Sequence, residues 1–169
     1  MSGKLIAVRR ARMVALLASA AGAALIIGVI GMTALPSSAS ALPGKAIPAA
    51  AAHRLRTDVI RIARFNGDAH PVSIRAVATT EAKALVTATP GDTVPGSASQ
   101  PAYLVVMKGH FKLTHASVPP GARIPTGRYL SLTINPSTMQ VMDLGLRNAP
   151  PPHASLRTYG PVSDLTTQR

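Results

Sequence analysis

The sequence contains no cysteine and no tryptophan, and aromatic residues make up only 3% of its 169 positions. Without cysteine the chain cannot form a disulfide, so a domain built from it must be stable through packing alone. The same absence excludes thiol nucleophiles, zinc or iron–sulfur sites built on cysteine, and the cysteine-linked lipid anchor of bacterial lipoproteins. The core must instead consist of Leu, Val, Ile, Met and Ala.

Acidic side chains are also scarce. Against 18 Lys and Arg residues the chain has six acids, which are Asp58, Asp68, Glu81, Asp92, Asp143 and Asp164. Hydrolysis by paired carboxylates needs two acids that face each other, but these six lie on different expected elements. Asp143 interrupts an apolar strand, and the alternation around it favours an outward-facing residue over a catalytic acid.

Other catalytic and metal-binding patterns are missing as well. His110 and His115 are five residues apart, so on one strand they would lie on opposite faces, and there is no H-E-x-x-H motif. There is no G-x-S-x-G, no S-x-x-K and no glycine-rich phosphate loop. We therefore expect no metal, no cofactor and no enzymatic activity. The alternative is a small hydrolase or enzyme inhibitor with an unrecognised site, because distant residues can assemble a triad without a motif.

The N-terminal segment, residues 1–41, has the features of an export signal. Residues 1–12 carry four basic residues and no acid, residues 13–35 carry no charge, and Ala39-Ser40-Ala41 provides a small-x-small cleavage pattern. A helix over residues 13–35 would be about 34 Å long, enough to cross a bilayer. We expect a single-pass anchor in the cell membrane with a cytoplasmic N-terminus. The alternative is a signal peptide, cleaved near Ala41, with secretion of the rest.

The remaining chain has the patterns of a small α+β domain. Leu55, Val59 and Ile62 share one helical face, and Asn66-Gly67 is a good helix stop. The pattern predicts a linker at 42–52, a helix at about 50–65, a strand at 72–79, a short helix at 81–88, a long strand at 102–114, and a hairpin of strands at 128–134 and 139–146. The hairpin turn contains Asn135-Pro136, a favourable pair for a tight turn.

The long strand has the clearest alternation. One face carries Tyr103, Val105, Met107, Phe111 and Leu113, and the other carries Leu104, Val106, Lys108, His110, Lys112 and Thr114. Gly109 lies where a bulge could bend such a strand. The predicted fold is an N-terminal transmembrane or signal helix followed by an antiparallel sheet of about four strands with one helix packed on it. This domain would cover 53–146, with a proline-containing tail at 147–169.

Positive charge is the main functional signal in the exported part. The whole chain has a net charge of +12. The candidate residues for binding an anionic surface are Arg54, Arg56, Arg61, Arg64, Lys108, His110 and Lys112. A basic domain beside a membrane would attract anionic lipid or wall polymers, with the loops at 89–101 and 115–127 as further contact surfaces. The same charges also fit a solvated face. Nucleic acid is not an expected partner, because aromatics are not interleaved with these charges.

Several segments together resemble a known group of proteins. In order they are VATTEAKAL, PAYLVVMKGHF, PPGARIPTGRYLSLTI and VMDLGL, and the resemblance covers about residues 55–165. They resemble small exported or membrane-anchored proteins of high-GC Gram-positive bacteria. The resemblance implies an extracytoplasmic domain but no established activity and no site residues. We therefore expect a tethered or secreted, non-enzymatic domain that binds an envelope component or a protein partner.

Overall fold

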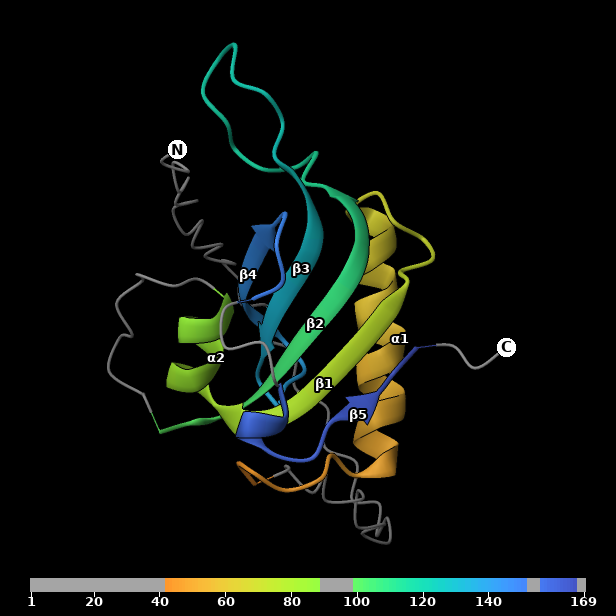
Figure 1. The fold of residues 1–169 in the computed structure, drawn as a ribbon, viewed down its shortest axis with the longest axis vertical. Helices are drawn as coiled ribbons and strands as arrows, with labels where there is room; N and C mark the ends of the chain where they lie inside the picture. Colours follow the sequence, from red (N-terminus) through yellow and green to blue (C-terminus); the bar gives the residue numbers. More distant parts are fainter. Residues whose placement is uncertain (1–41, 89–98, 152–155, 167–169) are drawn as a thin grey trace, which may run out of the picture. The chain divides into compact units, whose positions relative to one another are not determined.

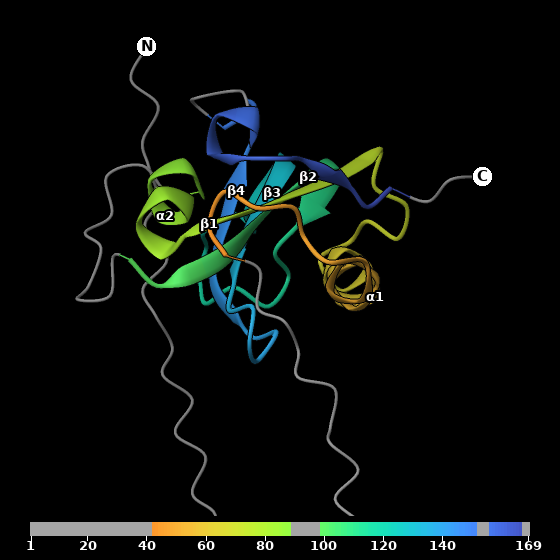
Figure 2. The same cartoon turned by 90° about the horizontal axis from the view of Figure 1, so that it is seen from below.

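The computed structural model describes residues 42–88, 99–151 and 156–166 (Figures 1 and 2). The elements in chain order are α1 (Ala49–Phe65), β1 (Ser73–Thr80), α2 (Glu81–Ala88), β2 (Pro101–Lys112), β3 (Thr126–Ile134), β4 (Val141–Arg147), η1 (Leu156–Tyr159) and β5 (Ser163–Asp164). The predicted export segment at 1–41, its boundary with the linker, and residues 89–98 of the first predicted loop lie outside the described residues. Within the described ranges, no helix combines the length and the apolar character needed to cross a membrane.

The strands form one antiparallel sheet in the order β4-β3-β2-β1-β5. The α+β class, the helices predicted at about 50–65 and at 81–88, the strands and the hairpin are confirmed. The sheet has five strands rather than about four, and two helices pack on it rather than one. The fifth strand comes from the predicted tail: Leu165 N–H donates to the carbonyl of Ile74 at 2.8 Å, and Ile74 N–H donates to Thr166 Oγ1 at 2.9 Å.

Helix α1 ends where the sequence predicts. The N–H of Gly67 donates to the carbonyl of Arg64 at 3.1 Å, and the N–H of Asp68 donates to the carbonyl of Ala63 at 3.0 Å. Gly67 has a φ of 88°, which glycine adopts without steric cost. This pair of bonds is the Schellman arrangement, which satisfies carbonyls that the helix end would otherwise leave without donors.

The two faces of the sheet are packed differently, and Figure 2 shows α1 and α2 on opposite sides of it. The face under α1, here the α1 face, forms the main core. Its buried residues include Leu55, Val59, Ala63, Ile74, Ala76, Ala78, Tyr103, Val105, Met107, Phe111, Leu130, Leu132 and Ile134. The opposite face, here the α2 face, has a smaller cluster of Val77, Ala84, Ala102 and Leu104. It also buries the polar side chains of Ser131 and Thr133.

A bulge interrupts β2 at the predicted glycine. The pairing with β3 shifts between Lys108 and Phe111. In the bulge, His110 N–H donates to the Asp68 carboxylate at 2.7 Å. A Cβ at Gly109 would collide with that carboxylate, so a larger residue here would displace the Asp68 side chain from its hydrogen bond to the bulge. The bulge therefore connects the end of β2 to the α1–β1 loop.

Candidate functional site

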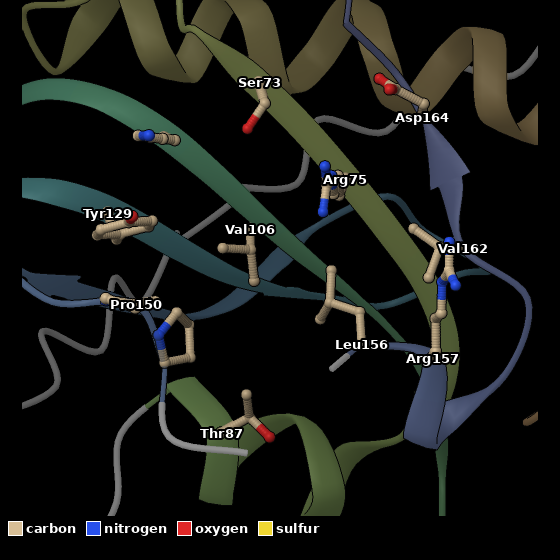
Figure 3. A pocket seen from close by; sticks show the side chains of 12 residues that line it. Ser73, Arg75, Thr87, Val106, Tyr129, Pro150, Leu156, Arg157, Val162 and Asp164 are labelled. Carbon is tan, nitrogen blue, oxygen red and sulfur yellow. The ribbon is translucent and has the colours of Figure 1, made fainter. Parts of the chain in front are cut away.

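A pocket of about 540 Å³ lies on the α2 face (Figure 3). Its lining consists of Ser73, Arg75, Thr87, Val106, Lys108, Tyr129, Pro150, Pro151, Leu156, Arg157, Val162 and Asp164. Its volume falls within the range of small-molecule sites. The residues come from β1, α2, β2, β3 and the part of the chain that follows β4, here called the C-terminal segment. These elements lie far apart in the sequence.

The register of the sheet brings the central lining residues together. Ser73 on β1 pairs with Lys108 on β2, and Lys108 pairs with Tyr129 on β3. The next row on the same face contains Arg75 and its partner Val106. Directly paired residues project to the same side of a sheet, so all five side chains rise from the α2 face.

Helix α2 covers only part of this face. It packs over the paired residues Val77 and Leu104. On each strand this row lies two residues away from the pocket row of Arg75 and Val106. Only Thr87, from the last turn of α2, reaches the pocket. The half of the α2 face that lies beyond α2 is therefore the floor of a concavity.

The C-terminal segment forms a second wall of the pocket, in addition to α2. Leu156, Tyr159 and Val162 pack against the apolar cluster of the α2 face. The hydroxyl of Thr87 donates to the carbonyl of Lys83 at 2.9 Å and lies 2.7 Å from the Tyr159 hydroxyl. Because Thr87 has used its only proton, Tyr159 donates to it. This hydrogen bond joins the C-terminal segment to α2 at the edge of the pocket.

Positive charge predominates around the opening. The described residues of the lining include three exposed cations, Arg75, Lys108 and Arg157, and one exposed carboxylate, Asp164. Arg147, which is not among the lining residues, is the register partner of Tyr129 on the neighbouring strand β4, and its partial burial lowers the pKa of its guanidinium. An opening with this charge excess attracts anions.

The carboxylate of Asp164 is already engaged within the protein. Its Oδ1 accepts the N–H of Thr166 at 2.9 Å. Hydrogen bonds from the Thr166 side chain and backbone lower the pKa of Asp164, and the positive charge of Arg75 lowers it further. Asp164 therefore stays ionised at neutral pH and offsets only part of the positive charge.

The floor of the pocket is mostly apolar. Val106, Leu156 and Val162 are half-buried, and Pro151 is buried. Figure 3 shows Val106 in the middle of the pocket, with Tyr129, Arg75 and Leu156 around it. Exposed charges thus surround a surface that favours contact with hydrocarbon.

The lining offers little for acid–base catalysis. Among the residues that the structure describes, it contains neither a histidine nor Asp143. Asp143 is half-buried on β4 and pairs with Thr133, in the row that α2 covers. Asp164 is a weak base because its pKa is lowered. Across 42–88, 99–151 and 156–166, no three His, Asp or Glu residues are grouped so that they could hold a metal ion.

The arginines predicted to bind an anionic surface lie away from the pocket. Arg54, Arg61 and Arg64 are exposed on α1, and Arg56 on the same helix is half-buried. Arg61 forms an ion pair with Asp58 at 2.9 Å. Since α1 packs on the other face, these residues and the pocket lie on opposite sides of the sheet.

The three candidates on β2 are separated by the bulge. Lys108 lines the pocket, whereas His110 in the bulge and Lys112 beyond it are exposed and are not among the lining residues. Lys112 N–H donates to the carbonyl of Asn66 at 2.8 Å. The sequence reasoning therefore identified one pocket cation and missed Arg75 and Arg157. Arg75 could have been found, because it alternates with apolar residues in a strand that pairs with β2.

Comparison with protein-family models, with curated proteins and with solved structures gave no match.

Proposed function

We propose that this chain is an extracytoplasmic, non-enzymatic domain that binds small organic anions in the pocket of the α2 face. The observation that carries the proposal is the convergence of Arg75, Lys108 and Arg157 around one apolar floor, with Asp164 as the one carboxylate among the described lining residues. Such a site binds through charge attraction and apolar contact together.

The expected location of the domain supports this proposal. The uncharged segment at 13–35 favours a single-pass anchor, with cleavage near Ala41 as the alternative. Either outcome would place the pocket outside the cytoplasm, and the anchor would hold it in the cell envelope, where anionic lipids and polymers are concentrated. The ligand would then be a component of the envelope or a product released from it.

The chemistry of the lining favours binding over turnover. A hydrolytic site needs a nucleophile beside a base with a suitable pKa. The hydroxyl of Thr87 already donates to the carbonyl of Lys83, and the carboxylate of Asp164 has a lowered pKa. The lining therefore supplies positive charge and apolar surface for binding, and we assign no residue a catalytic role.

A direct test is calorimetric titration of the full chain, in uncharged detergent, with butyl phosphate. We expect binding of one ligand per chain at 0.1 M salt. Binding should weaken several-fold at 1 M salt, where the Debye length falls from about 10 Å to about 3 Å. Lack of binding at millimolar ligand in 0.1 M salt would contradict the proposal.

A second candidate is the attachment of α1 to an extended anionic surface. Arg54, Arg61 and Arg64 fall within about 80° of each other around the helix at 3.6 residues per turn, and all three are exposed. These arginines would bind a lipid or wall surface rather than a small molecule. Locating the bound anion on the chain separates the two candidates.

A further inference from the structure

The arrangement of charge and hydrocarbon in the pocket narrows the class of ligand. Its cations, Arg75, Lys108 and Arg157, are exposed at the opening, while Val106 and Leu156 are half-buried and Pro151 is buried. A small inorganic anion would use the cations but leave the apolar floor in contact with water. The floor contributes to affinity only if the ligand carries hydrocarbon.

We infer that the pocket is built for an amphiphilic anion, a carboxylate or phosphate carried by a short aliphatic chain. This inference rests on the proposed function and adds the nature of the ligand. The anionic group would lie beside Lys108 and Arg75, which occupy adjacent rows of the sheet on neighbouring strands. The aliphatic chain would lie on Val106 and extend towards the wall formed by the C-terminal segment.

The position of the walls supports this orientation. The apolar side chains of Leu156 and Val162 belong to the same cluster as Val77 and Leu104 beneath α2. The hydrocarbon surface of the pocket therefore continues into that cluster, on the side of Thr87. Ser73 and Lys108 lie at the other end, beyond the row of Arg75 and Val106. A ligand with its anionic end beside Lys108 and Arg75 and its aliphatic end beside Leu156 matches this arrangement; the third cation, Arg157, is exposed on η1 next to Leu156.

The test is a series of short ligands titrated into the full chain in uncharged detergent at 0.1 M salt. Methyl, ethyl, propyl and butyl phosphate vary the chain at constant charge, pentanoate changes the anionic group, and butanol removes it. We expect the affinity of the phosphates to rise about twofold to fourfold for each added methylene. Pentanoate should bind measurably, and butanol should bind far more weakly than butyl phosphate.

A variant of the floor provides an internal check. Val106→Thr keeps the shape of the side chain but replaces a methyl group with a hydroxyl. It should flatten the dependence on chain length, because it should lower the affinity for butyl phosphate more than the affinity for methyl phosphate. The matched control is Val72→Thr, at a valine that is 66% exposed and outside the lining. This control should retain the dependence of the unmodified chain.

The outcomes distinguish this inference from the proposed function. Equal affinity for all four phosphates would overturn the inference that the ligand is amphiphilic, and the proposed function, an anion site, would stand. A dependence on chain length that Val106→Thr does not change would place the hydrocarbon elsewhere and also overturn the inference. Butanol binding as tightly as butyl phosphate, or no binding by any anion, would overturn both.

Discussion

The two faces of the sheet are formed by the same strands but differ in how completely a helix covers them. Val105 and Val106 are neighbours on β2, yet Val105 is 0% exposed under α1, while Val106 is half-buried on the pocket floor. The α1 face is closed by a helix of 17 residues, and the α2 face is only partly covered by a helix of 8 residues. The short second helix thus leaves part of the sheet open, where we propose that the ligand binds, while the long first helix covers the main core.

The largest expected effect tests whether stability is concentrated on the α1 face. Val105→Ala should lower the free energy of unfolding by about 2–3 kcal/mol, because it leaves a cavity in a closed core. Val106→Ala removes the same atoms from the half-open face and should cost about 1 kcal/mol or less. Urea denaturation of both variants measures the difference. Equal losses would show that the faces do not differ in this way.

The next prediction concerns the charge at the opening. Lys108→Gln should weaken binding of butyl phosphate about fivefold, the loss expected for one solvent-exposed charge contact worth about 1 kcal/mol. Lys112→Gln removes the same charge from the same strand, outside the pocket, and should leave affinity within about twofold of the unmodified chain. Calorimetric titration of both variants checks this. An equal loss would mean that net charge, not the pocket, attracts the anion.

A smaller effect is expected at the hydrogen bond that closes one edge of the pocket. Tyr159→Phe removes the hydroxyl 2.7 Å from Thr87 and should lower the free energy of unfolding by about 0.5–1 kcal/mol. Tyr129→Phe is the matched control, because the structure gives the Tyr129 hydroxyl no hydrogen bond within the described ranges. Chemical denaturation should rank Tyr159→Phe as the more costly change, and the reverse order would argue against this link.

The smallest effect is a pH dependence at β5. Thr166 lowers the pKa of Asp164 in the folded protein, so the ionised carboxylate stabilises the fold. That contribution is present above the unfolded pKa, near 3.8, and is lost as the pH falls through the lower folded value. In NMR titration, the Thr166 amide signal should move with a midpoint below 3.8. It should lose this transition in Asp164→Asn, and a midpoint at or above 3.8 would contradict the assignment.

The sequence predicted the local elements better than the site. Period-two and helical patterns identified β2 and α1, and Gly109 was correctly associated with a bulge. By contrast, β5 contains two residues, which are too few to show alternation. Its position depends on hydrogen bonds between Ile74 and the segment at 165–166, which are more than ninety positions away. The fifth strand is therefore a consequence of tertiary packing.

The pocket was missed for a related reason. Lys108 stood out within its own strand, but its neighbours Ser73 and Tyr129 come from β1 and β3. Only the register of three strands places them in one row. The arginines of α1 appeared more prominent in the sequence because four of them occur within one helix, although the fold places them on the side opposite the pocket.

The most direct test of the central proposal is to locate a bound organic anion on the full chain by NMR. Butyl phosphate should be titrated at 0.1 M salt while backbone amide signals are followed across both faces of the sheet. We predict the largest shift changes at Arg75, Val106 and Lys108, with those of Arg54 and Arg61 on α1 nearly unchanged. Shifts confined to the α1 arginines, with the pocket residues unaffected, would contradict the account.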